Sequence, residues 1–243
     1  MTIYSTRQLR LLALCLPVVA CTGLMAFAWL QEKDNTLTAA EKKAGWVLLF
    51  DGKTTTNWKA YNNKLSDGWE VVNGELHCKE NGVQNRADLI TASQYENFEL
   101  AFDWKIGKGF NSGVVYRVVE SEHPSYESGP EYQLIDDLGY PDKLEDWQKS
   151  GADYAMHAPA KIVSKPAGEY NHTRIVVKGA HVEHWLNNVK VADFELWTPE
   201  WYRLKEKSKW KDVAAYGMAK KGYIGLQDHG GGIWFKNIKL KTL

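Results

Sequence analysis

The chain has 243 residues, and its 30 basic and 30 acidic side chains give a formal net charge of zero. This balance gives no electrostatic reason to expect a nucleic acid or an anionic surface as the partner. Aromatic residues make up 12% of the chain, including 11 tryptophans and 12 tyrosines. Their flat faces and polar edges suit either core packing or stacking on sugars.

The first 28 residues have the pattern of an export signal. Arg7 and Arg10 precede an apolar run over residues 11–30, and residues 1–28 contain no acidic side chain. Three fates are open: cleavage after Ala28, lipid attachment at Cys21, or retention as a membrane anchor, since the run reaches about 20 residues. Each fate predicts an exported protein, periplasmic or associated with the cell envelope, whose membrane contact is confined to this segment.

The remaining chain predicts a linker followed by one domain. Residues 29–44 are polar and charged, with at most a short helical pattern, which is typical of a linker. Residues 45–243 are long enough to form a single hydrophobic core. They contain one cysteine, Cys78, so no disulfide can form within the domain, and packing must stabilise it.

Short apolar runs separated by turn residues recur through the domain. In the clearest run, Phe98, Leu100, Phe102 and Trp104 alternate with mostly polar residues, which predicts a strand with one buried face. The other predicted strands are 46–50, 69–72, 75–79, 88–91, 113–119, 131–136, 172–178, 182–186, 189–194, 223–227 and 233–240. A dozen short strands without a long amphipathic helix predict an all-β sandwich of antiparallel sheets.

Three longer segments interrupt this rhythm. Residues 120–130 and 137–160 are polar loops on either side of the strand at 131–136, and residues 197–220 are rich in tryptophan, lysine and arginine. Loops as long as the first two are often functional in a compact domain, whereas the third segment is compatible with a helical turn.

The strand between the two polar loops carries the strongest candidate site. Period-two geometry puts Glu131 and Gln133 on one face and Tyr132 and Leu134 on the other. If the apolar face is core, the preceding strand can add Arg117 to the polar face. A carboxylate, an amide and a guanidinium on one face can bind sugar hydroxyls. A solvent-exposed ladder of ion pairs is the alternative.

Asp136 and Asp137 end this strand and either cap a turn or bind a cation, which makes them weak candidates for a metal site. No His-x-His, His-Glu-x-x-His or Cys-x-x-Cys spacing occurs, so a structural zinc site is not predicted. The Gly-x-Ser-x-Gly elbow of many serine hydrolases is also missing.

Two histidines near strand ends are candidates for proton transfer. His184 shares a strand face with Val182 and Leu186, so a place in the core is the alternative for its imidazole. His229 follows Gln227 and precedes three glycines, which permit positive φ and a sharp turn. The pattern around these glycines predicts paired strands over residues 222–243, with Gln227 and His229 on one face.

Taken together, these motifs resemble the 3-keto-disaccharide hydrolase domain family, also known as domain of unknown function 1080. They are Leu49-Phe50-Asp51-Gly52-Lys53, Trp69 to His77, Asn111 to Arg117, Glu131 to Asp137, His184 to Asn187, and Gly225 to Gly230. The resemblance covers residues 45–243. It implies a concanavalin-A-like jelly roll of two curved antiparallel sheets whose concave face binds carbohydrate.

The resemblance also implies action on 3-keto-glycosides. A ketone at C3 acidifies the C2 proton, so a base can remove it, the C1 substituent can leave, and water can add to the product. The candidate base is Glu131, and the candidate acids are His184 and His229. The candidate substrate-binding residues are Asn111, Arg117, Gln133, Trp185 and Gln227, with Trp185 as a stacking platform. A divalent cation at the ketone is an option, and no other cofactor is implied.

Two alternatives stay open. A direct glycosidase would pair Glu131 with a second carboxylate, such as Asp136 or Asp228. A non-catalytic carbohydrate-binding module would use the same fold without turnover, because jelly rolls support both functions.

Overall fold

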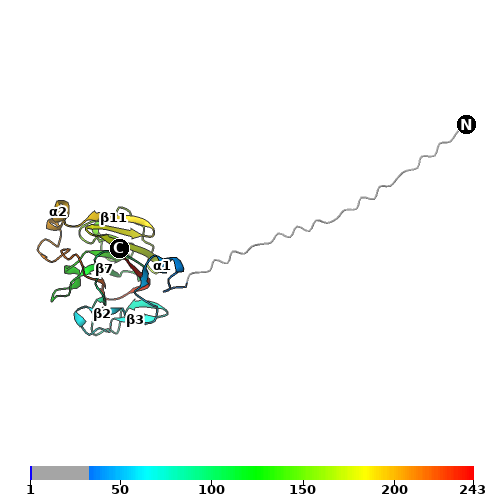
Figure 1. Cartoon of the computed structure of the whole chain (residues 1–243), viewed down its shortest axis with the longest axis horizontal. Coiled ribbons are helices and arrows are strands. Elements are labelled where there is room, and N and C mark those ends of the chain that lie inside the picture. Colours follow the sequence, from blue (N-terminus) through cyan, green and yellow to red (C-terminus); the bar gives the residue numbers. More distant parts are fainter. Residues whose placement is uncertain (2–32) are drawn as a thin grey trace. The chain divides into compact units, whose positions relative to one another are not determined.

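In the part of the chain that the computed structural model describes, Met1 and residues 33–243, two antiparallel sheets form nearly all the regular structure (Figure 1). The larger sheet has the order β11 (Val189–Glu195), β10 (His181–Leu186), β9 (Asn171–Lys178), β6 (Phe98–Ile106), β13 (Ile233–Thr242), β4 (Glu75–Cys78) and β3 (Trp69–Val72), with β1 (Trp46–Leu48) also on β13. The smaller sheet has the order β2 (Trp58–Ala60), β5 (Leu89–Thr91), β12 (Tyr223–Leu226), β7 (Asn111–Val118) and β8 (Glu131–Ile135). The predicted all-β jelly-roll sandwich is confirmed.

Short helices lie in the connections. They are α1 (Ala39–Lys43), α2 (Pro199–Lys207) and the 3₁₀ turns η1 (Tyr61–Asn63), η2 (Ser125–Glu127) and η3 (Asp146–Gln148). The sequence did not predict β2, because a strand of three residues is too short to show an alternating pattern. None of the helices in the described residues is long and apolar enough to span a bilayer. The predicted export segment, residues 1–28, lies outside the described residues apart from Met1.

The hydrophobic core fills the space between the two sheets. Phe102 and Trp104 of β6 face Tyr132 and Leu134 of β8 across it, and all four are at most 1% exposed. The rings of Phe102 and Tyr132 meet edge to face, with centroids 6.5 Å apart. Burial of each such side chain contributes about 1.5–3 kcal/mol. Because Tyr132 and Leu134 point into the core, the alternate residues of β8 must point to the other face of the smaller sheet.

The two strands predicted as a pair near the C-terminus do not pair with each other. β12 lies in the smaller sheet and β13 in the larger one, so the chain crosses between the sheets at Gly230, Gly231 and Gly232. All three glycines have positive φ, at 99°, 99° and 74°. A Cβ at Gly231 would lie 2.3 Å from the carbonyl oxygen of Lys79. The glycines therefore serve a crossing between sheets rather than a hairpin.

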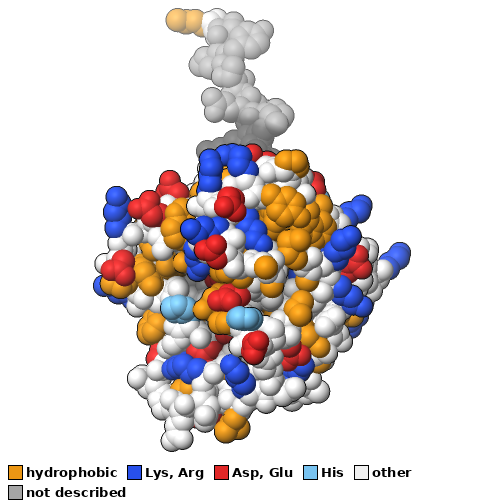
Figure 2. All heavy atoms as spheres, turned by 90° about the vertical axis from the view of Figure 1, so that its left-hand side faces the viewer, with side chains coloured by type: hydrophobic (Ala, Val, Ile, Leu, Met, Phe, Trp, Pro, Cys, Tyr) orange, Lys and Arg blue, Asp and Glu red, His pale blue; other side chains and the backbone are white. Residues whose placement is uncertain are grey.

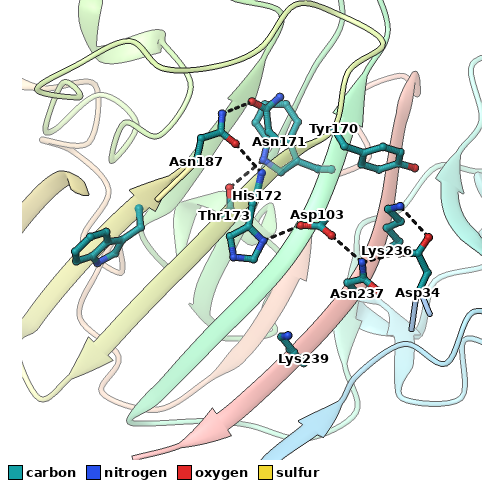
Figure 3. A network of polar contacts seen from close by, with 12 residues as sticks. Asp34, Asp103, Tyr170, Asn171, His172, Thr173, Asn187, Lys236, Asn237 and Lys239 are labelled. Carbon is teal, nitrogen blue, oxygen red and sulfur yellow. Dashed lines mark hydrogen bonds and ion pairs between the residues drawn. The ribbon is translucent and has the colours of Figure 1, made fainter. Parts of the chain in front are cut away.

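The segment predicted as a linker, residues 29–44, is part of the folded unit from Lys33 onward. The backbone N–H of Asn35 donates to Asn237 Oδ1 at 2.6 Å, and the N–H of Asn237 donates to Asn35 Oδ1 at 2.8 Å. Figure 3 shows the network that continues from Asp34 through Asn237 to Asp103 and His172. These polar contacts attach the segment to β13 and β6, and a purely local pattern could not reveal them.

One face of the molecule shows how its charged side chains are distributed. On the face in Figure 2, basic and acidic side chains are interspersed without a continuous basic patch, and hydrophobic side chains gather at the upper right of the domain. This view of one face agrees with the balanced charge of the sequence.

Candidate active site

A pocket of about 150 Å³, called here the central pocket, opens on the face of the smaller sheet that points away from the core. Five residues predicted from the sequence line it: Asn111, Glu131, Gln133, Gln227 and His229. The pairing of β7 with β8 sets Gly113 opposite Gln133 and Val115 opposite Glu131. The N–H of Gln227 then donates to the carbonyl oxygen of Gly113 at 2.9 Å. Strand pairing thus brings residues from three distant parts of the chain to one surface.

Three further lining residues come from the three long segments that interrupt the strand pattern. Tyr126, Tyr154 and Lys209 contribute one side chain each. The sequence marked the first two segments as functional candidates and the third only as an interruption of the strand pattern, and it gave no reason to choose these residues within them. The backbone N–H of Tyr154 donates to the carbonyl oxygen of Glu131 at 3.0 Å, which fixes its loop over the start of β8.

Lys209 is positioned by its aromatic neighbours. Its Nζ lies 4.5 Å from the ring centroid of Tyr154 and 4.3 Å from that of Trp210. Trp210 is buried, stacks on Tyr216 with centroids 4.3 Å apart, and donates from its indole N–H to the carbonyl oxygen of Tyr154. Partial burial of the ammonium lowers the pKa of Lys209, while the nearby Glu131 opposes this change. Contacts between a cation and ring faces hold the ammonium at the pocket.

The polar side chains on the floor of the central pocket are free to bind a ligand. The side chains of Asn111, Glu131, Gln133 and Gln227 have no hydrogen-bond partner among residues 33–243, although Gln133 is only 2% exposed and Gln227 only 7% exposed. Buried polar groups in folded proteins are normally paired with protein or water. A carboxyl and three amides that converge unpaired on one pocket are therefore suited to a ligand rich in hydroxyl groups.

Glu131 has the most perturbed carboxyl in the pocket. Burial is the largest cause and raises its pKa to about 8; the positive charge of Lys209 lowers the pKa, and the negative charges of Asp88 and Asp153 raise it. Glu131 as a whole residue is 4% exposed. Its protonated and ionised forms are both populated near neutral pH, which is the condition for a group that accepts and returns a proton.

The structure places His184 in the core rather than at the central pocket. It is fully buried between the sheets, with Nε2 3.1 Å from the hydroxyl of Tyr116 and Nδ1 3.0 Å from the carbonyl oxygen of Gly151. Burial lowers the pKa of His184 to about 3. A neutral imidazole without access to the pocket cannot protonate a leaving group there. This differs from the expectation that His184 shares a surface with Glu131.

Arg117 also lies away from the central pocket, for a reason that strand alternation could not predict. It has a φ of 58° and sits where the register of β7 and β12 shifts, between the pairs Tyr116 with Ile224 and Val118 with Tyr223. This bulge turns the side chain away from the Glu131 face. Its Nη2 donates to the carbonyl oxygens of Glu96 and Gly179 at 3.1 and 2.7 Å. Arg117 therefore acts as an internal link rather than a ligand-binding group.

Trp185 belongs to the larger sheet and is not among the residues that line the central pocket. Its indole N–H donates to Glu183 Oε2 at 2.8 Å, and the guanidinium of Arg174 lies 4.1 Å from its ring centroid. The predicted stacking role of Trp185 does not fit this position, because the ring is already covered by Arg174 and lies on the other sheet.

The two weak candidates for a metal site serve as caps. The carboxylate of Asp136 accepts hydrogen bonds from the backbone N–H groups of Gly109 and Gly139, at 2.9 and 3.0 Å. Asp137 accepts from the N–H of Ser150 at 2.9 Å and from the hydroxyl of Ser164. Of the two options left open for this pair, the structure shows the turn-capping one.

Among residues 33–243, the side chains of His181, Glu183 and Asp193 also come within reach of one another. The ammonium of Lys190 pairs with both carboxylates of this group, and Glu195 lies 2.8 Å from His181 Nδ1. The group lies on β10 and β11 and is not part of the central pocket.

Comparison with known proteins identifies the family. The 3-keto-alpha-glucoside-1,2-lyase-like domain matches residues 45–241. The chain belongs to this family. It is 32% identical to the 3-keto-disaccharide hydrolase of Bacteroides thetaiotaomicron, over 96% of this chain and 97% of that protein. Membership makes the protein a carbohydrate-active enzyme of the hydrolase or lyase type.

Solved structures agree with this assignment. A candidate glycosyl hydrolase from Parabacteroides distasonis is 40% identical, with a TM-score of 0.82, over 87% of this chain and 100% of that one. A second candidate glycosyl hydrolase from the same organism is 31% identical, with a TM-score of 0.65, over 82% of this chain and 99% of that one. These two proteins are therefore similar to this chain in fold as well as in sequence.

Proposed function

We propose that this enzyme cleaves glycosidic bonds of 3-keto-glycosides by elimination followed by hydration, and that it acts after export. The observation that carries the proposal is the group of unpaired polar side chains around Glu131, whose burial raises its pKa to about 8. The name of the Bacteroides thetaiotaomicron relative, a 3-keto-disaccharide hydrolase, supports the substrate class.

In the first step, the Glu131 carboxylate removes the proton from C2 of the sugar. The C2–H bonding electrons form an enolate, whose negative charge lies on the oxygen of the C3 ketone. This step is accessible because a ketone makes the neighbouring C–H acidic, and a buried carboxylate with a raised pKa is a stronger base than an exposed one. The amides of Asn111, Gln133 and Gln227 hold the hydroxyl groups of the ring.

In the second step, the enolate electrons form a C1–C2 double bond and expel the oxygen substituent on C1. His229, at the exposed edge of the central pocket, donates the proton that this oxygen takes up. Lys209 is the cationic side chain that lines the pocket, and it stabilises negative charge on the ketone oxygen. Water then adds its hydroxyl group to C1 and gives its other proton to His229, which replaces the one lost to the leaving oxygen. Glu131 returns its proton to C2, so the net reaction is hydrolysis.

The arrangement of carboxylates favours elimination over a direct glycosidase. Glu131 is the one carboxyl among the described residues that line the central pocket. Asp136 is engaged as a turn cap, and the carboxylate of Asp228 is fully buried and pairs with Arg86 at 2.6 Å. A direct glycosidase needs a second carboxyl on the other side of the same glycosidic bond, about 5–9.5 Å away.

The mechanism is tested by exchange of the C2 proton with solvent. Wild-type enzyme in D₂O should incorporate deuterium at C2 of the released 3-keto sugar, and Glu131→Gln should lose this exchange together with product release. Faster cleavage of an ordinary β-glucoside than of its 3-keto form would instead support the direct glycosidase. Sugar binding without any turnover, with and without added divalent metal, would support the binding module.

Export is tested independently of catalysis. We expect fractionation of the native host to recover the protein from the periplasm or cell envelope. Mass spectrometry of its N-terminus should reveal cleavage after Ala28, a lipid on Cys21, or an intact anchor. Recovery in the cytoplasm with an intact, unmodified N-terminus would contradict export.

A further inference from the structure

A second pocket of about 230 Å³, called here the flanking pocket, adjoins the central pocket. Tyr126 lines both. Two consecutive residues also connect the pockets: Asp228 lines the flanking pocket, and His229 lines the central pocket. A ligand that is too large for the central pocket can therefore extend past Tyr126 into the flanking pocket.

Internal hydrogen bonds fix the boundary between the two pockets. The carboxylate of Asp88 accepts from the backbone N–H of Asp228 at 2.8 Å and from the hydroxyl of Ser125. Arg86 pairs with the carboxylate of Asp228 and donates to the carbonyl oxygen of Lys79 at 3.1 Å. Because these bonds tie the ends of β5 and β12 to η2, the flanking pocket is a built feature of the fold rather than a gap between mobile loops.

The sizes of the pockets also point to a shared ligand. The central pocket, at about 150 Å³, is smaller than the range of about 300–1,000 Å³ that is usual for small-molecule sites. With the flanking pocket added, the space lies within that range. A ligand that fills both pockets therefore has two parts, one on each side of Tyr126.

The chemistry of the flanking pocket suits a neutral polyol. The side chains of Lys64 and Glu122 are exposed at this pocket, and neither has an ion-pair partner among residues 33–243. An ammonium donates hydrogen bonds and a carboxylate accepts them, so the pair matches hydroxyl groups, which do both. Arg86 and Lys64 line this pocket together with Asp88, Glu122 and Asp228, so charges of both signs are present and no excess of positive charge selects a phosphate or another anion.

We propose that the flanking pocket binds the sugar that leaves from C1, while the central pocket holds the ring with the 3-keto group. The bond to be cleaved then crosses the boundary beside His229, where a proton must reach the leaving oxygen. This assignment rests on the proposed function, because it takes the two-part ligand to be a 3-keto-disaccharide.

The test compares two substrates of the same enzyme. A 3-keto-disaccharide places a sugar in the flanking pocket, whereas a methyl 3-keto-glucoside places only a methyl group there. Lys64→Ala combined with Glu122→Ala should lower kcat/KM about tenfold for the disaccharide, as expected for the loss of two exposed hydrogen bonds, and leave the methyl glycoside within about twofold of wild type. Lys178→Ala combined with Glu206→Ala, both exposed and outside these pockets, is the matched control.

Three results would overturn the assignment. One is an equal effect of the double variant on both substrates, and another is no effect on either. The third is a selective loss for the disaccharide in Trp147→Ala but not in the double variant. Trp147 lines another cavity, of about 290 Å³, that meets the central pocket at Lys209, so this last result would place the leaving sugar there.

Failure of the proposed function gives a different pattern, because wild-type enzyme would then turn over neither substrate. The flanking pocket is still tested in that case by isothermal titration with both compounds. Tighter binding of the disaccharide by wild type, with the difference abolished in the double variant, supports the assignment. Equal affinities of wild type for both compounds would overturn it.

Discussion

The carboxylate of Glu131 lies directly against the Cα of Gly113 on the neighbouring strand. A Cβ built on Gly113 would come within 2.2 Å of Glu131 Oε1 and 2.7 Å of its carboxyl carbon. Gly113 has ordinary extended backbone, so the strand does not need a glycine there for its conformation. The missing side chain instead leaves room for the carboxylate of Glu131. The position of the proposed base therefore depends on a glycine two residues away from its own cross-strand partner, Val115.

Gly113→Ala should displace the Glu131 carboxylate and lower kcat about 100-fold, because a shift of about 1 Å in a reacting group has an effect of that size. Gly225→Ala is the matched control, since a Cβ there meets nothing closer than 3.5 Å. Both variants should unfold in urea at concentrations close to that of wild type. Steady-state kinetics on a 3-keto-glycoside provide the measurement, and a Gly113→Ala enzyme with more than half of the wild-type kcat would refute this role.

The pH dependence of activity should follow the ionisation of Glu131. Burial raises the pKa of Glu131 to about 8, so most of its carboxyl groups are protonated at lower pH. Only the ionised fraction can accept a proton. We therefore follow exchange of the C2 proton with D₂O, which uses Glu131 and not the proton donor His229, and expect its rate to rise about tenfold per pH unit below pH 8 and to level off above it. An exchange rate that is constant between pH 6 and pH 8 would exclude Glu131 as the base.

The same ionisation should affect stability in the opposite direction. The folded state binds the Glu131 proton more tightly than the unfolded state, so this contribution is fully present below the unfolded pKa and is lost as pH rises through about 8. Glu131→Gln should therefore be about as stable as wild type at pH 4 and more stable at pH 9, by about 2–5 kcal/mol. Urea unfolding at both pH values measures the difference, and a variant that is less stable at pH 9 would contradict the sign.

Lys209 should lower the pKa of the proposed base, Glu131. Its charge lowers the pKa of Glu131, so Lys209→Met should move the acidic limb of the pH profile to higher pH. Loss of its contact with the ketone oxygen should also reduce the limiting kcat about 10- to 100-fold. Lys211→Met, an exposed lysine two residues away, is the control and should leave both quantities unchanged. An unshifted profile in Lys209→Met would remove Lys209 from the site.

Arg117 should prove structural. Arg117→Ala removes the two hydrogen bonds to the carbonyl oxygens of Glu96 and Gly179, and it should lower the free energy of unfolding by about 2–4 kcal/mol. At a temperature where the variant is folded, KM should stay within about twofold of wild type, because the guanidinium does not line the central pocket. A large increase in KM with unchanged stability would restore the substrate-binding role predicted from strand alternation.

The sequence by itself determined the strands, and through them most of the floor of the central pocket. Alternation at Glu131, Tyr132, Gln133 and Leu134 depends only on the two-residue period of extended backbone, so it correctly put Glu131 and Gln133 on one face. It also marked the three long segments that supply Tyr126, Tyr154 and Lys209, because such segments break the period.

Only the tertiary structure decided on which face of a sheet the other candidate residues, such as Arg117 and His184, lie and which residues they contact. The bulge at Arg117 arises from pairing with β12, about 100 residues away in the chain, and His184 faces inward because the other sheet covers that side of β10. The same holds for Lys33 to Ala44, which become part of the domain through contacts with β13. Periodicity is a property of a few adjacent residues, whereas burial, bulges and converging side chains depend on pairing between distant segments, which no local pattern records.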